Sequence, residues 1–157
     1  MASPFYAQLA LRYRAAYWGV MFQNEMDEEL EIKGDWPVLE NGMLEELLCS
    51  EMWYQGKIEE PANVIYLKIN GNWHRLYFDY GIIFWRKDTE GPKEYEVPEL
   101  ESHFKVVDVG RKYNLINNLI ESVVGHVLPK GSEVIFRLAD EKSITFSNIE
   151  DNTTYKT

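Results

Sequence analysis

Histidine is the side chain best suited to acid–base or metal chemistry near neutral pH, and this chain of 157 residues has three: His74, His103 and His126. Their spacing matches neither the i, i+4 pair of a metal-binding helix nor a close pair on a strand. The single Cys49 cannot complete a cysteine-rich zinc site or form an intramolecular disulfide. We therefore expect no metal and no cofactor.

Adjacent acidic residues form a second group that could do chemistry, as paired carboxylates do in glycosidases and magnesium sites. They occur as three pairs: Glu28–Glu29, Glu45–Glu46 and Glu59–Glu60. Neighbouring carboxylates on surface segments are ordinarily solvated, so the pattern predicts a hydrophilic surface. The sequence also lacks the glycine-rich phosphate loops and the nucleophile elbow of known enzyme classes. These features favour a protein that is not an enzyme.

The stretch from Val64 to Lys87 carries the main candidate site. Asn70–Gly71 suits a two-residue type I′ turn because both residues tolerate positive φ, and this turn pairs Ile69 with Asn72. The alternation of strand side chains then collects apolar residues on one face of the ribbon. The other face is expected to be exposed and to bind a partner, through Tyr66, Lys68, Trp73, Arg75, Tyr77, Asp79 and Trp85.

The same ribbon supports an alternative hypothesis, a small enzyme or ligand-binding domain with a pocket beside His74. The register puts His74 on the apolar face at the open rim, where it could act as a general base near Asp79 and Arg75. A rim histidine that is hydrogen-bonded to backbone is the simpler interpretation. Cation–aromatic pairs such as Lys68 with Trp73 also stabilise a sheet without any ligand.

Charge is distributed unevenly along the chain. Residues 1–60 hold twelve acidic and four basic residues, a net charge of −8 out of −10 for the whole chain. A nucleic-acid-binding protein needs a stripe of lysine and arginine to neutralise phosphates, and the sequence has none. An acidic surface instead attracts a basic partner, and Asp27, Glu28 and Glu29 are the residues selected for this role. The competing interpretation is that the charge only confers solubility.

The location of the protein is predicted from its N-terminus and its cysteine content. The apolar N-terminal stretch is interrupted by Arg12 and Arg14 and has no basic segment before its apolar run, so it predicts neither a signal peptide nor a membrane span. One unpaired cysteine suits a reducing compartment. We expect a cytoplasmic protein that does not bind membranes.

Hydrophobic periodicity predicts the elements that position these residues. Helical spacing predicts one helix over about 4–24, a second through Leu44, Leu47, Leu48 and Met52, and a third over about 112–124. Strands are predicted in EELEIKGDWP, in the ribbon around Asn70–Gly71, in a short segment of the acidic connection that follows it, and in HFKVVDV. A second hairpin is predicted in which Leu138 faces Ile144 and Phe136 faces Phe146.

The expected fold is a single α+β domain over residues 1–157, frayed from about 150. Its antiparallel sheet of about five to seven strands, built from two hairpins plus single strands, is expected to pack against two or three helices. The chain resembles small intracellular immunity proteins, which neutralise bacterial toxins, in size, acidity, layout and lack of a catalytic motif. That likeness is compositional, covers no defined motif and carries over no functional residue.

The leading functional hypothesis is a non-enzymatic intracellular protein-binding module, of which an acidic inhibitor of a basic partner is one example. Acidic segments would steer the partner and exposed aromatic residues would anchor it. A third hypothesis is a homodimer formed through the aromatic N-terminal helix.

Overall fold

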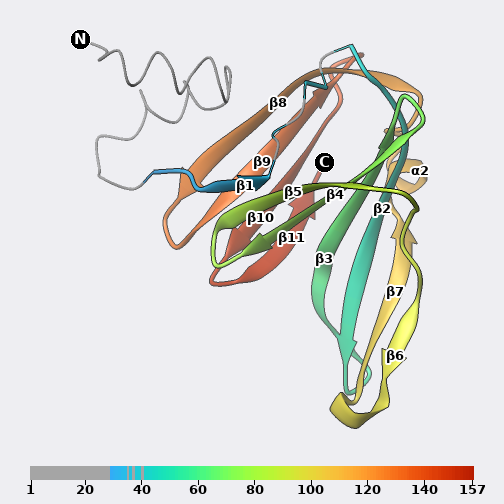
Figure 1. Cartoon of the computed structure of the whole chain (residues 1–157), viewed down its shortest axis with the longest axis vertical. Helices are drawn as coiled ribbons and strands as arrows, with labels where there is room; N and C mark the ends of the chain where they lie inside the picture. The colour runs from blue at the N-terminus through green and yellow to red at the C-terminus, as the bar shows by residue number, and fades with distance from the viewer. Residues whose placement is uncertain (1–28, 35, 37, 40) are drawn as a thin grey trace.

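The computed structural model describes residues 29–157 except 35, 37 and 40, and this part of the chain is built almost wholly of β-strands (Figure 1). The strands are β1 (Ile32–Gly34), β2 (Met43–Tyr54), β3 (Lys57–Ile69), β4 (Asn72–Asp79), β5 (Ile82–Asp88), β6 (Tyr95–Val97), β7 (Ser102–Asp108), β8 (Asn118–Leu128), β9 (Gly131–Leu138), β10 (Ser143–Ile149) and β11 (Asn152–Lys156). Within the described residues the only helical elements are α2 (Val109–Lys112) and a 3-10 turn, η1 (Pro98–Leu100). The expected α+β class is therefore wrong, because no helices of the described chain cover the sheet.

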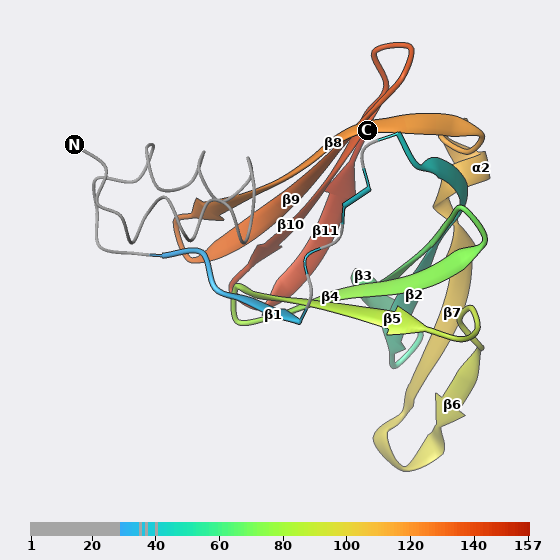
Figure 2. The same ribbon diagram turned by 45° about the horizontal axis from the view of Figure 1, so that its top comes forward.

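The strands form one sheet in the order β1-β5-β4-β3-β2-β8-β9-β10-β11, with β7 paired to β2 and β6 paired to β7. Met43 and Leu44 of β2 pair with β8, whereas residues 48–54 of β2 pair with β7. The sheet therefore bends at this short junction into two layers. Figure 2 shows β2–β5 and β8–β11 as the two layers, with β6 and the adjoining end of β7 extending away from both.

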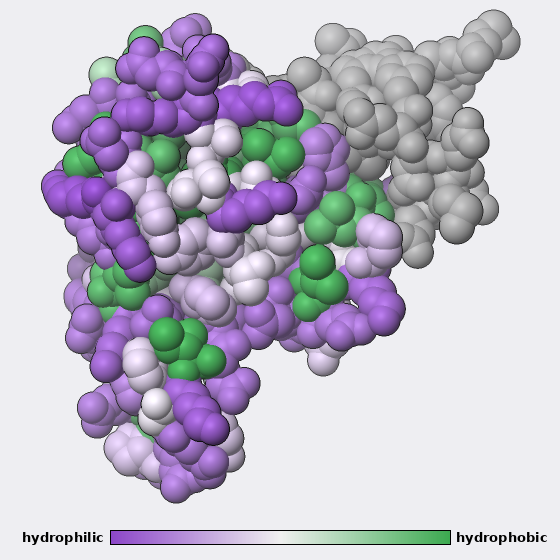
Figure 3. Space-filling view, turned by 180° about the vertical axis from the view of Figure 1, so that it is seen from behind, coloured by the Kyte–Doolittle hydropathy of each residue, from purple (hydrophilic) through white to green (hydrophobic). Residues whose placement is uncertain are grey.

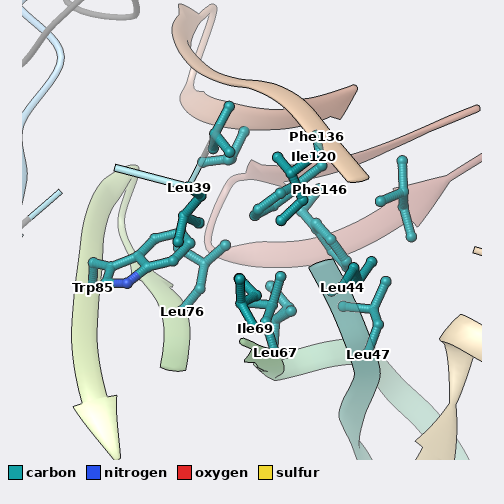
Figure 4. Packing of buried hydrophobic residues seen from close by; sticks show 14 of the residues in the cluster. Leu39, Leu44, Leu47, Leu67, Ile69, Leu76, Trp85, Ile120, Phe136 and Phe146 are labelled. Carbon is teal, nitrogen blue, oxygen red and sulfur yellow. The ribbon is translucent and has the colours of Figure 1, made fainter. Parts of the chain in front are cut away.

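The hydrophobic core lies between the two layers. Leu67, Leu76 and Trp85 come from one layer, and Phe136 and Phe146 come from the other. Figure 4 shows Leu39 and Leu76 beside the Trp85 ring, with the phenylalanines on the opposite side of the core. Full burial of one large apolar side chain contributes about 1.5–3 kcal/mol, so this cluster is the main source of stability. Seen from behind, the apolar residues at the surface form separate patches among hydrophilic ones (Figure 3).

The helix predicted through Leu44, Leu47, Leu48 and Met52 is wrong, because these residues belong to β2. The pairing of β2 with β3 has register shifts between Leu44 and Glu46 and on both sides of Met52. A bulge adds one residue to one strand, so buried positions lose the strict spacing of two. Leu44 and Leu47 are consequently both buried although they are three residues apart, which is the spacing of one helical turn, whereas Leu48 and Met52 are only partly buried.

The helix predicted over about 112–124 is wrong for the same reason. Only Val109–Lys112 is helical, and Asn118–Leu128 forms the long strand β8. A register shift between Ile120 and Ser122 puts Ile120 and Val123 on the same buried face although they are three residues apart. The shift therefore reproduces the apolar spacing of one helical turn.

The hairpin predicted at Asn70–Gly71 is confirmed. Both residues have positive φ, 48° and 80°, and the pairs Ile69–Asn72 and Leu67–His74 are those that a two-residue turn requires. The strand predicted in HFKVVDV is confirmed as β7, and the short strand of the acidic connection as β6.

The second hairpin is also present, but its predicted register is wrong by two residues. Phe136 faces Ile144 and Val134 faces Phe146, because the loop is centred one position earlier than predicted: the Leu138 N–H donates to the Lys142 carbonyl at 2.8 Å, and Asp140 and Glu141 adopt positive φ between them. A shift of two residues keeps every side chain on its expected face. The apolar residues of the predicted pairs are therefore all buried although the pairs differ, and Thr145 on the opposite face is buried as well.

The C-terminal residues expected to fray from about 150 instead form β11, which pairs along β10. Side chains also join β11 to β3. Asn152 Nδ2 donates to the Glu59 carbonyl at 2.8 Å, and Glu60 Oε1 accepts the Thr153 backbone N–H at 2.8 Å. The expectation of fraying is therefore corrected, since the last strand is tied down at both edges.

The predicted N-terminal helix and its homodimer surface lie outside the described residues. Within the range that the structure describes, no helix is long and apolar enough to cross a membrane.

Candidate functional site

The outward side of strands β3, β4 and β5 carries the residues that the sequence singled out. We define the aromatic face as seven partly exposed residues of these strands: Tyr66, Lys68, Trp73, Arg75, Tyr77, Phe84 and Arg86. Strand pairing arranges them in rows, because Tyr66 faces Arg75 and Arg75 faces Arg86, while Tyr77 faces Phe84. The face is thus built on three neighbouring strands with fixed register.

Cations and rings alternate across the aromatic face. Lys68 Nζ lies 5.8 Å from the centre of the Trp73 ring, Arg75 lies 5.9 Å from that of Tyr77, and Arg86 lies 5.6 Å from that of Phe84. The rings of Tyr77 and Phe84 stack at 4.9 Å with an angle of 2° between their planes. Each cation–ring contact is worth about 0.5–1 kcal/mol at an exposed site, so the side chains are ordered before any partner arrives.

Arg75 stands at the middle of this face with an unused donor. Its Nε lies 3.7 Å from Asp88 Oδ2, which is too long for a hydrogen bond, and this buried atom has no hydrogen-bond partner among the described residues. Burial raises the pKa of the neighbouring Tyr66, although the Arg75 guanidinium partly opposes this shift. The Tyr66 hydroxyl is therefore protonated at neutral pH, and it can donate as well as accept hydrogen bonds.

One of the seven predicted binding residues of the ribbon, Trp85, lies on the other side of the sheet. Trp85 is only 2% exposed and packs in the core, so the expectation that it is an exposed anchor is corrected. The cause is a second turn at Tyr80–Gly81, where φ is 45° and 80°, which makes Asp79 face Ile82 and reverses the expected sides of β5. Asp79 is exposed at the end of β4 beside that turn.

The same turn explains the residues that sequence reasoning missed. Phe84 and Arg86 are absent from the predicted binding residues, and they in fact complete the aromatic face. Gly81 was a usable signal, but tyrosine at positive φ is uncommon. Two tertiary hydrogen bonds hold the turn, from the Tyr80 N–H to Asp151 Oδ1 and from the Gly81 N–H to Asn148 Oδ1, both at 2.9 Å.

Behind the aromatic face, on the core side of β4, His74 borders a cavity of about 450 Å³. The cavity opens where the β3–β4 hairpin and the end of β5 meet the segment before β2. Its apolar lining includes Leu39, Ile69 and Trp85, and its polar lining includes Asn70, His74 and Lys87. Neither Asp79 nor Arg75 borders it, so the structure does not bring together the three residues of the proposed general-base site.

The protonation of His74 is set by Trp85. The indole N–H of Trp85 donates to His74 Nδ1 at 3.1 Å, so the single proton of the neutral ring lies on Nε2. Burial lowers the pKa of His74, and the nearby Lys87 ammonium lowers it further. His74 is thus a neutral imidazole bonded to an indole, and not to backbone as expected.

The other histidines lie apart from this cavity. His103 stacks on Trp53 at 5.5 Å in the extension formed by β2 and β7. His126 Nδ1 lies 3.3 Å from Glu133 Oε1, and the Ser147 hydroxyl donates to the other oxygen of that carboxylate at 3.4 Å. A nucleophilic triad needs the serine hydroxyl to be hydrogen-bonded to the imidazole, whereas here both groups contact the carboxylate. His126, Glu133 and Ser147 therefore form a structural group. No group of three potential metal ligands occurs in the described part of the chain.

Several of the acidic pairs also have structural roles. Glu45 Oε2 accepts the Gly71 N–H at 3.0 Å at the hairpin turn, and Glu60 holds β11. Glu29 is exposed, whereas Asp27 and Glu28 lie outside the described residues. Cys49 is fully buried, and burial raises its thiol pKa far above the usual range, so it is not a nucleophile.

Comparisons with protein-family models, with curated proteins and with solved structures found no match to this chain. Its function must therefore be argued from its own surfaces.

Proposed function

We propose that this protein is a non-enzymatic binding module that docks another protein on the aromatic face. The observation that carries the proposal is the set of three cation–ring contacts, Lys68 with Trp73, Arg75 with Tyr77 and Arg86 with Phe84, on one partly exposed sheet surface. Tryptophan, tyrosine and arginine are the residues that most often dominate the energy of protein interfaces. A surface made of these residues is suited to binding.

The rigidity of the aromatic face supports the same conclusion. The side chains stand on paired strands and already contact one another, so little conformational entropy is lost when a partner orders them. The Tyr66 hydroxyl provides a donor beside Arg75 at the centre of the face, whereas the buried Arg75 Nε is not accessible to a partner. A partner that supplies an acceptor there gains a hydrogen bond that the free protein does not make.

The charge of the chain favours a basic partner. The formal net charge is −10. Exposed carboxylates such as Glu29 and Glu31 attract a partner at long range, whereas the cations of the aromatic face act on it only at short range. Such a field raises association rates and weakens with salt. The buried free thiol of Cys49 is compatible with a reducing compartment, and we propose a cytoplasmic location on this basis.

The proposal is tested with a photo-crosslinking amino acid. Benzoylphenylalanine replaces Tyr77 in one variant and Thr154, an exposed residue of β11 in the other layer, in a matched control. Both variants are expressed in the native host and irradiated. We expect one protein to be crosslinked from position 77 and not from 154, with a yield that falls at high salt. Equal yields from the two positions would contradict the proposal.

A further inference from the structure

We propose that the cavity beside His74 binds a small organic carboxylate, whose charged group is held by Lys87 and His74 and whose apolar body lies against Trp85, Ile69 and Leu39. The cavity measures about 450 Å³, which is within the range of roughly 300–1,000 Å³ typical of small-molecule sites. Most of its lining lies on the core side of β4, opposite the aromatic face, although Trp73 of that face and Asp88 also border the cavity.

His74 provides the first donor of the site. The ring is only 6% exposed, and its Nδ1 is occupied by the Trp85 indole, so its proton is on Nε2. No described residue accepts a hydrogen bond from Nε2, although the ring borders the cavity. Nε2 keeps some accessible surface, so an acceptor bound in the cavity can reach this donor and form a hydrogen bond with it.

Lys87 provides the positive charge. It faces His74 across the β4–β5 pair, on the same side of the sheet, and no acidic residue of the described chain forms an ion pair with it. Asp88 is the only carboxylate in the described lining, and its Oδ2 lies near Arg75 on the aromatic face. The charge next to His74 is therefore positive, which suits an anionic ligand.

Asn70 adds a third donor whose orientation is fixed. Its Oδ1 accepts the Met43 N–H at 3.0 Å, so its amide NH₂ remains for other partners. The polar part of the cavity is thus rich in donors, whereas Leu39, Ile69 and Trp85 form an apolar wall. An amphipathic carboxylate matches both halves. An organic cation would be repelled by Lys87, and a neutral ligand would leave that charge unpaired.

The test uses 2-naphthylacetate and its neutral amide, 2-naphthylacetamide, as probes. Each is titrated into the ¹⁵N-labelled full chain while the Trp85 indole N–H signal is followed by NMR. We expect the carboxylate to shift this signal and to bind about tenfold more tightly than the amide, since a charge-assisted bond is stronger than a neutral one. Lys87→Met should remove the difference between the probes. Lys57→Met, an exposed lysine at the start of β3, should not.

The proposal is overturned if neither probe binds, if both bind equally, if Lys87→Met keeps the preference, or if the shifted signals lie on the aromatic face away from Trp73, which borders the cavity. Tyr77→Ser separates this site from the proposed protein interface. It should leave naphthylacetate binding unchanged while it abolishes crosslinking to a protein, so each idea can fail without the other.

Discussion

The indole N–H of Trp85 donates to Nδ1 of His74 at 3.1 Å, and both side chains are almost completely buried. The bond joins β5 to β4 from the core side, and the same two strands present Arg75, Tyr77 and Phe84 on the outer side. An interior hydrogen bond therefore helps to hold in register the strands that carry the proposed binding surface.

Replacing Trp85 with phenylalanine should lower the free energy of unfolding by about 2–4 kcal/mol, because it leaves a cavity and removes the partner of His74 Nδ1. Urea denaturation measures the change. Trp73→Phe is the matched control, since Trp73 is partly exposed and donates to no core group among the described residues, and it should cost below about 1 kcal/mol. Equal losses in the two variants would exclude the role given to the buried pair.

Stability should decrease as the pH falls below about 6.5, the ordinary pKa of histidine. Because the pKa of His74 is lowered in the folded state, the unfolded chain binds its proton first, and acid favours unfolding. The slope of the unfolding free energy attributable to this proton cannot exceed about 1.4 kcal/mol per pH unit. Urea titrations between pH 7.5 and 5 should show a flatter dependence for His74→Gln. His103→Gln, the control outside the core, should keep the dependence of the natural sequence.

Glycine is favoured at two positions, Gly71 and Gly131, for different reasons. Gly71 has φ of +80° and open space around it, so Gly71→Ala should cost only the backbone strain of about 1–2 kcal/mol. A Cβ at Gly131 would instead clash with the backbone carbonyl of Asn148 on the paired strand β10. Gly131→Ala should therefore destabilise the protein more than Gly71→Ala does in thermal unfolding. The opposite order would contradict the close packing of β9 on β10.

The turn at Tyr80–Gly81 offers a stabilising substitution. Tyr80 is 80% exposed and has φ of 45°, a region in which asparagine is far better tolerated than tyrosine. Tyr80→Asn should raise the free energy of unfolding by about 0.5–1 kcal/mol, because asparagine adopts this φ with less strain. The backbone hydrogen bond to Asp151 is retained in the variant. Thermal unfolding checks this, and a lower melting temperature would show that the exposed ring contributes contacts not seen here.

The turns at Asn70–Gly71 and Tyr80–Gly81 also illustrate how much of the fold could be predicted from the sequence. Asn70–Gly71 has the chemistry of a type I′ turn, so the register of β3 with β4 and the outward position of Tyr66, Trp73 and Arg75 could be derived locally. Tyr80–Gly81 lacks an asparagine or aspartate and is held by Asp151 and Asn148, about 70 positions later in the chain. A turn that is fixed by distant residues leaves little signal in the local sequence. Because this turn was not predicted, the inward and outward sides of β5 were assigned the wrong way round.

The mistaken helices have a similar physical cause. In β2 and β8 the register shifts near Glu46 and Ile120 leave Leu44 with Leu47, and Ile120 with Val123, buried at a spacing of three. Periodicity reports only which residues are apolar, and a bulged strand can bury two residues at the spacing of one helical turn. The outward residues of β3 and β4 in the candidate site were predicted correctly, because these strands pair without a register shift between Ile65 and Ile69.

The most direct test of the account is the dissociation rate of the protein captured from position 77. Tyr77→Ser removes a central ring that stacks on Phe84, and loss of an interface anchor costs about 2 kcal/mol or more. Surface plasmon resonance should therefore show dissociation accelerated by roughly 30-fold or more for this variant and an unchanged rate for Thr154→Ala. If Tyr77→Ser leaves the dissociation rate within about twofold of the natural sequence, the aromatic face is not the binding surface.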